Sequence, residues 1–186
     1  MKVVGFAGYS GSGKTTLVEA VITLLVAGGQ TVGVVKHAHH RFDVDQPGKD
    51  SWRHRKAGAR EVLVASDMRL ALMREYAERH EPTAHELIAE LDASLDWVLV
   101  EGFRGSDLPK IEVWRAPSAD FAGHAAHYPA DTQVRAVCTD RPDQLPVATA
   151  LPVLDWSKPA EVVAWMRHNA QSFTYPKPVK PVKASQ

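Results

Sequence analysis

The chain has 186 residues, 45% of them hydrophobic, and its 22 basic and 22 acidic side chains give zero formal net charge. This balance argues against electrostatic capture of nucleic acid or of an anionic membrane, so we expect neither partner. No apolar stretch reaches the length of a membrane span, and the single cysteine, Cys138, excludes an internal disulfide and favours a cytoplasmic protein.

The first predicted element is the strand Val3–Ala7, and the segment GYSGSGKT at residues 8–15 follows it directly. This segment fits the phosphate-binding pattern G-x-x-x-x-G-K-[ST] at every fixed position. A helix is predicted at Thr15–Ala27, because Leu17 and Val21 begin a series of apolar residues at helical spacing. Strand, glycine loop and helix together predict a nucleotide-binding P-loop.

The residue types of this loop indicate how it binds a nucleotide. Backbone N–H groups of the loop and of the helix N-terminus bind phosphate oxygens. Lys14 is expected to reach the β- and γ-phosphates, Thr15 to bind Mg²⁺ through its hydroxyl, and Thr16 to reach the α-phosphate. A Rossmann loop is disfavoured, because its glycines follow another order. The predicted phosphate-binding residues are Gly8, Ser10, Gly11, Ser12, Gly13, Lys14, Thr15 and Thr16.

A dense polar segment follows the second predicted strand, Val32–Lys36. Its three histidines and two aspartates suit either a metal site or a loop that senses the γ-phosphate. Asp43 or Asp45 could reach Mg²⁺ through water, and Lys49 could meet a phosphate. The alternative is a polar loop whose side chains are merely solvated. The histidines of this segment are His37, His39 and His40.

The rest of the chain alternates predicted strands and helices. Continuous apolar strands between helices predict an α/β fold with a mostly parallel sheet covered on both faces. The run Val62–Ala65 pairs with Leu70–Met73 as a predicted hairpin. The further strands are predicted at Trp97–Val100, Ile111–Trp114 and Val134–Cys138, and the helices at Ser51–Ala59, Ala84–Leu91 and Ala160–Asn169.

Polar residues follow two of these strands. Glu101 ends the run Trp97–Val100 and is the predicted acidic partner of Mg²⁺, with a surface glutamate at a turn as the alternative. Gly102 is expected to offer its N–H to a γ-phosphate. Asp140 follows Val134–Cys138 and is a candidate for guanine recognition, because a carboxylate can accept both N1–H and N2–H; it could equally open a turn. The familiar N-K-x-D guanine signature is absent.

The C-terminal segment from Ser172 alternates proline and lysine and has almost no large apolar side chains. Such a composition cannot form a helix or a core. We therefore expect a nucleotide-binding domain at residues 1–171 and a flexible tail at 172–186, which is either a solvated appendage or a docking segment. Cys138 lies in an apolar strand and is expected to be a small buried residue rather than a nucleophile.

Several stretches together resemble one family, the molybdopterin-guanine dinucleotide biosynthesis protein B (MobB) family of small P-loop GTP-binding proteins. The longest of them, at residues 35–59, is far more specific than the P-loop, which many unrelated enzymes share. The resemblance covers roughly residues 1–170 in order. Its stretches are GYSGSGKTTL at 8–17, VKHAHHRFDVDQPGKDSWRHRKAGA at 35–59, ALM at 71–73, LDWVLVEGF at 95–103 and PKIEVWR at 109–115.

The resemblance implies a doubly wound α/β domain of the P-loop NTPase class that dimerises through an added β element. It also implies Mg²⁺ and GTP as ligands, slow hydrolysis, and service to the molybdenum cofactor guanylyltransferase and molybdopterin-bearing proteins. By position, Glu101 and Gly102 would be the second acidic motif. The loop near the γ-phosphate or the partner's pterin would comprise His37, His39, His40, Asp43, Asp45, Lys49 and Asp50.

Two other functions remain open from the residues. A P-loop nickel metallochaperone would use the three clustered histidines as ligands. A small-molecule kinase would need an arginine-rich lid, but Arg53, Arg55 and Arg60 fit a solvated helix face better. No residue is an obvious general base, so we expect slow hydrolysis by the isolated protein.

Overall fold

The structure, a computed structural model, describes residues 1–38 and 42–176. The chain forms two compact units, one made of Met1–His37 with Thr83–Gln186, the other of Ala38–Pro82. None of the three buried apolar clusters among the described residues contains a residue of Ala38–Pro82. The single domain predicted at residues 1–171 is therefore divided, because its middle segment does not share the main core.

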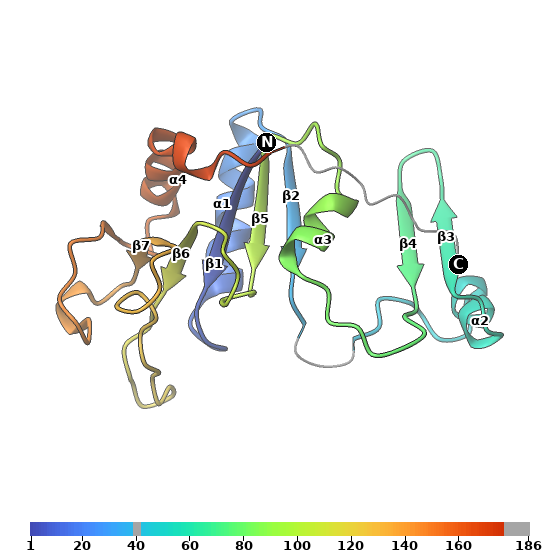
Figure 1. Cartoon of the computed structure of the whole chain (residues 1–186), viewed down its shortest axis with the longest axis horizontal. Helices are drawn as coiled ribbons and strands as arrows, with labels where there is room; N and C mark the ends of the chain where they lie inside the picture. The colour runs from blue at the N-terminus through green and yellow to red at the C-terminus, as the bar shows by residue number, and fades with distance from the viewer. Residues whose placement is uncertain (39–41, 177–186) are drawn as a thin grey trace. The chain divides into compact units, whose positions relative to one another are not determined.

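A six-stranded sheet forms the centre of the first unit (Figure 1). The strand order is β2-β5-β1-β6-β7-β8, and every neighbouring pair is parallel. This confirms the predicted parallel sheet; the short strand β8 was not predicted. The strands are β1 (Lys2–Ala7), β2 (Val32–Lys36), β5 (Trp97–Glu101), β6 (Lys110–Val113), β7 (Val134–Cys138) and β8 (Val153–Leu154).

Helices cover both faces of this sheet, as predicted. Helices α1 (Lys14–Ala27) and α4 (Pro159–His168) share a buried cluster with one face, and α3 (Ala84–Glu90) shares another with the opposite face. Successive residues of a strand point to opposite faces. Val4 therefore joins the cluster of α1 and α4, while Val3 joins that of α3. This double burial explains why the strands are continuously apolar.

The ends of the helices follow from local sequence signals. The Thr83 hydroxyl oxygen accepts a hydrogen bond from the Glu86 N–H at 3.2 Å, and the Glu86 carboxylate accepts one from the Thr83 N–H at 2.7 Å. This capping box starts α3. Helix α1 ends at Ala27, before two glycines of which Gly29 adopts a left-handed φ of 78°.

The second unit contains α2 (Asp50–Lys56) and an antiparallel hairpin of β3 (Glu61–Ala65) and β4 (Leu70–Arg74). The Ser66 hydroxyl oxygen accepts two backbone N–H groups of the connecting turn. The hairpin predicted from sequence is thus confirmed, while α2 ends earlier than predicted. The remaining short elements are the 3₁₀ turns η1 (Pro142–Gln144) and η2 (Ala170–Phe173).

The beginning of the predicted tail is part of the first unit. Phe173 is fully buried, and its ring lies near those of Trp97 and Trp165, with centroids 6.0 and 5.9 Å away. The Tyr175 N–H also donates to the Met1 carbonyl at 3.1 Å. The predicted boundary at Ser172 is therefore wrong, because one aromatic side chain anchors a segment of otherwise polar composition. Residues 177–186 lie outside the described residues.

Cys138, the last residue of β7, is fully buried in the cluster that α1 and α4 share. Burial raises the pKa of its thiol to about 12. The thiol is therefore protonated and unreactive at neutral pH, as predicted for a small buried residue.

Across residues 1–38 and 42–176, no helix has both the length and the apolar character needed to cross a membrane.

Candidate functional site

The glycine loop of residues 8–13 connects β1 to α1 at the carboxyl edge of the sheet. Gly8 has a φ of 143°, and a β-carbon there would lie 2.4 Å from the Val113 carbonyl oxygen. Gly13 is the N-cap of α1 and is left-handed, with a φ of 90°. Both positions require glycine. The turn places the first N–H groups of α1, which have no partner within the helix, beside the loop.

Lys14 and Ser12 present polar groups within the loop. The Lys14 ammonium donates to the Tyr9 carbonyl at 2.6 Å, which holds the side chain over the loop. Burial lowers the pKa of Lys14, although the nearby Glu101 carboxylate opposes this effect. The Ser12 hydroxyl is buried and has no hydrogen-bond partner among the described residues. Ser10, Gly11 and Thr16 are exposed.

Glu101 and Thr15 meet as predicted, and Lys36 joins them. The Thr15 hydroxyl donates to Glu101 Oε1 at 2.6 Å, and the Glu101 side chain is only 10% exposed. The Lys36 ammonium lies 3.1 and 3.2 Å from the two carboxylate oxygens. A hydroxyl and a carboxylate are the oxygen donors that Mg²⁺ prefers, so these residues fit the ion. Sequence reasoning missed Lys36, although it ends a strand at the same sheet edge.

Gly102 has a different role from the one predicted. Its N–H donates to the Phe6 carbonyl at 3.2 Å and thus continues the pairing of β5 with β1. Its φ is 94°, and a β-carbon there would lie 2.9 Å from His37 Cβ. Position 102 therefore requires glycine because the chain packs closely against His37 after β5. Its amide N–H is already bonded and is not open to a phosphate.

An aromatic layer lies against the P-loop. The Tyr9 ring stacks on His124 and His127, with centroids 4.1 and 4.9 Å away. The Arg104 guanidinium lies 5.0 Å from the Tyr9 ring centroid, and Arg115 donates to the Gly11 carbonyl at 3.2 Å. Sequence reasoning missed this layer, because nothing in the local pattern of residues 116–131 indicates which segment they contact.

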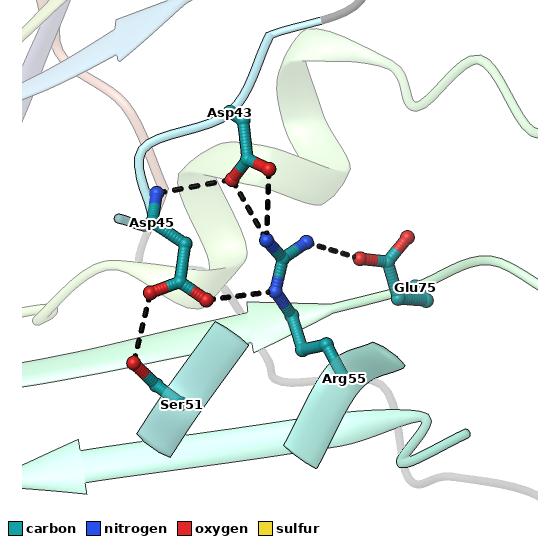
Figure 2. Close-up of polar contacts among 5 residues, drawn as sticks. All are labelled: Asp43, Asp45, Ser51, Arg55 and Glu75. Carbon is teal, nitrogen blue, oxygen red and sulfur yellow. Dashed lines mark hydrogen bonds and ion pairs between the residues drawn. The ribbon is translucent and has the colours of Figure 1, made fainter. Parts of the chain in front are cut away.

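The acidic residues of the polar segment meet Arg55 within the second unit (Figure 2). One guanidinium nitrogen of Arg55 lies 2.8 and 3.0 Å from the two Asp43 oxygens, and its Nε lies 3.0 Å from Asp45 Oδ2. A third carboxylate, that of Glu75, lies 2.6 Å from another guanidinium nitrogen. Asp45 also accepts from the Ser51 hydroxyl at 2.8 Å. The guanidinium thus organises three segments that are separate in sequence.

This network corrects the prediction that Arg55 lies on a solvated helix face. The Arg55 side chain is 13% exposed, so it does not belong to a solvated helix face. Its hydrogen bonds, first to Glu75 and then to Asp43, raise the pKa of Arg55. The Asp45 N–H and then Arg55 lower the pKa of Asp43. The structure thus gives Asp43 and Asp45 a cationic side chain as partner, while their water-mediated contact with Mg²⁺ stays a prediction.

Of the three histidines in the polar segment, the structure describes only His37. The His37 ring packs against Phe103, with centroids 4.7 Å apart. His39 and His40 lie outside the described residues. In the described part of the chain, no three or more His, Cys, Asp or Glu side chains come together as a metal site.

The last predicted residues lie at element ends. Lys49 is the N-cap of α2 and Asp50 is its first residue. Asp140 is exposed after β7, next to the buried Thr139, whose hydroxyl oxygen accepts the Arg141 N–H at 3.1 Å. The turn that Asp140 opens is consistent with either sequence interpretation, a guanine contact or a structural residue.

Comparison with known proteins identifies a family. Residues 3–140 match the family described as MobB, molybdopterin guanine dinucleotide synthesis protein B. The chain is 44% identical over 168 residues to the molybdopterin-guanine dinucleotide biosynthesis adapter protein of Escherichia coli (strain K12), covering 89% of this chain and 93% of that protein. It is 46% identical over 115 residues to the adapter protein of the same description from Haemophilus influenzae, covering 61% and 63%.

Solved structures agree with this result. A MobB protein homolog from Bacillus stearothermophilus superposes with a TM-score of 0.65 at 28% identity, covering 92% of this chain and 99% of that one. Bacillus subtilis MobB gives a TM-score of 0.67 at 22% identity, covering 95% and 100%, which supports the fold alone. The fold is that of the P-loop NTPases, with an added antiparallel β element.

Proposed function

The chain belongs to the MobB family and is an adapter of molybdopterin guanine dinucleotide biosynthesis, and from this premise we propose that it binds GTP with Mg²⁺ through its P-loop. The observation that carries the proposal is the arrangement of Thr15 and Glu101 at the N-terminus of α1, directly after a left-handed glycine turn. A structural glycine turn would need neither the buried carboxylate nor the hydroxyl beside it.

Each residue of this site has a task in the proposed complex. The N–H groups of residues 8–16 hold phosphate oxygens, and Lys14 turns from the Tyr9 carbonyl to the β- and γ-phosphates. Thr15 and Glu101 hold Mg²⁺, which neutralises phosphate charge when bound. Asp140 accepts the guanine N1–H and N2–H. No side chain is assigned as general base, so hydrolysis by the chain alone is slow.

Calorimetric titration with GTP and ATP, each with Mg²⁺ and with a chelator, tests this proposal. We expect micromolar binding of Mg–GTP and a preference over ATP of at least about tenfold, because a guanine-specific carboxylate is left unpaired by adenine. Equal affinities would contradict guanine recognition. No binding of either nucleotide at millimolar concentration would contradict the P-loop assignment itself.

The proposed partner is the guanylyltransferase that joins molybdopterin to GMP, because the E. coli relative is named an adapter protein of this biosynthesis. An adapter needs a surface and a bound state rather than rapid turnover. We propose that the polar segment around Asp43, Asp45, Lys49 and Asp50, whose first two residues are held by Arg55, is presented to the molybdopterin-bearing protein. Co-purification of the two proteins with and without Mg–GTP tests this partnership.

We further propose that the protein is a homodimer and that the hairpin of the second unit forms the contact between the two copies. In the antiparallel register Leu63 faces Leu72 and Ala65 faces Leu70, so these residues share one face of the hairpin. Leu63, Leu70 and Leu72 are 59%, 65% and 42% exposed. An apolar face of this kind is rarely left in water by a monomer. A second copy of the same face would cover it with two-fold symmetry.

Leu72→Glu is expected to convert this dimer to a monomer, because the substitution puts two negative charges into the symmetric apolar contact. Light scattering after gel filtration measures the mass. Val26→Glu, which replaces another exposed apolar residue on α1, is the matched control and stays dimeric. A monomeric wild type, or a Leu72→Glu variant that stays dimeric, contradicts the proposal.

A further inference from the structure

The Lys36 ammonium lies against the oxygens that hold Mg²⁺ in the proposed function, on which this inference rests. Its Nζ is 3.1 Å from Glu101 Oε1, 3.2 Å from Glu101 Oε2 and 3.3 Å from the Thr15 hydroxyl oxygen. The Thr15 hydroxyl gives its proton to Glu101, so it meets Lys36 as an acceptor. A cation of the protein thus shares the acceptor oxygens that a divalent cation would need.

The sheet itself creates this contact. Lys36 and Glu101 are register partners in the parallel pair of β2 and β5. Register partners of neighbouring strands point to the same face, so the two side chains start side by side. The Lys36 side chain is 56% exposed, whereas that of Glu101 is 10% exposed. The carboxylate is therefore fixed in place, and the ammonium is on a flexible stem that can move away into water.

We propose that Lys36 is a built-in competitor of Mg²⁺, which neutralises Glu101 until the metal arrives and is displaced from it by the metal. A buried carboxylate without a cation nearby is unfavourable, so Lys36 compensates the charge of Glu101 and holds the carboxylate in position. A divalent ion bound to the same oxygens repels the ammonium at short range. The two cations therefore exchange, and the binding of metal releases the last side chain of β2.

An ordinary surface ion pair predicts different behaviour. Such a pair contributes little and leaves metal affinity unchanged when the lysine is removed. In an exchange, by contrast, removing the ammonium frees the oxygens, so the metal binds more tightly. The sign of this change distinguishes the two cases, because loss of a supporting residue would weaken metal binding.

Titration of the full chain with Mn²⁺, with free ion measured by its electron paramagnetic resonance signal, tests the exchange. One arm contains no nucleotide, and the other contains a non-hydrolysable GTP analogue. Lys36→Met and Lys36→Gln are expected to bind Mn²⁺ about five- to tenfold more tightly than wild type in both arms, since a half-exposed competing cation is worth roughly that factor. Two neutral replacements are used so that a folding defect in one variant does not decide the result.

Two further variants complete the design. Lys36→Arg keeps the charge and is expected to match wild type. Lys2→Met also removes one positive charge, but Lys2 lies at the start of β1, at the end of the strand away from the P-loop. This variant is expected to bind Mn²⁺ like wild type. The exchange is overturned if the neutral Lys36 variants bind Mn²⁺ no more tightly than wild type. It is also overturned if neither they nor wild type bind Mn²⁺ detectably. Failure of every variant to bind the GTP analogue overturns the proposed function, while the arm without nucleotide still decides the role of Lys36.

Discussion

Lys14→Ala is expected to weaken Mg–GTP binding by at least about 100-fold, because it removes two charge-assisted hydrogen bonds to phosphate of about 1.5–3 kcal/mol each. The structure places the ammonium where it can make them, since Lys14 begins α1 and its Nζ lies over the loop beside the Tyr9 carbonyl. Burial already lowers the pKa of Lys14, which shows that the site disfavours the isolated charge. A bound triphosphate would offset this cost of burying the ammonium charge, because it supplies opposite charge.

The same calorimetric titration measures this loss, with thermal unfolding of each variant to confirm that the fold is intact. Folding itself should be little affected, because the Lys14 side chain is only half-buried and bonds a single carbonyl. Lys2→Ala, at the opposite end of β1, is the matched control and is expected to bind like wild type. Affinity of Lys14→Ala within about threefold of wild type would contradict the assignment of the P-loop.

Phe173→Ala is expected to lower the free energy of unfolding of the first unit by about 3–5 kcal/mol, the usual cost of deleting a buried aromatic ring. Phe173 is fully buried and joins the cluster that lies between the sheet, α1 and α4. Its ring neighbours are Trp97 at the start of β5 and Trp165 in α4. The large rings around it cannot fully collapse into the cavity that its deletion leaves.

Urea denaturation followed by tryptophan fluorescence measures this change, because two of the reporting rings contact Phe173. Gln171→Ala, in the same 3₁₀ turn but exposed, is the control and is expected to change stability by less than about 0.5 kcal/mol. A loss below about 1 kcal/mol for Phe173→Ala would show that the segment after α4 is not part of the core.

Most of the fold of the first unit was predictable from local patterns. Buried strands such as Trp97–Glu101 are continuous apolar runs, and the capping box of Thr83 and Glu86 marks the start of α3. The P-loop was predictable for the same reason, since its glycines are needed by the backbone itself. In the second unit, the hairpin turn at Ser66 was predictable as well, because it carries its own hydrogen bonds. The two-residue strand β8 gave no such signal, because its pairing with β7 alone defines it.

The site was predicted only in part. Thr15 and Glu101 were expected to meet, because the carboxyl ends of parallel strands share one sheet edge. The role of Lys36 depends on β2 lying next to β5 in register, and strand order cannot be inferred from spacing along the chain. Arg55 was misjudged for a similar reason, since its three carboxylate partners come from two separate segments of the second unit, around residues 43–45 and at residue 75.

The sequence by itself determined the elements whose stability is local: the glycine loop, the capped helices, the apolar strands and the hairpin. Backbone strain, capping and apolar periodicity act over a few residues, so a single sequence displays them. Only the tertiary structure decided which cation meets Glu101, which carboxylates hold Arg55, and that Phe173 belongs to the core. These contacts join side chains that are far apart along the chain, and their partners are set by strand order and packing, which local sequence does not encode.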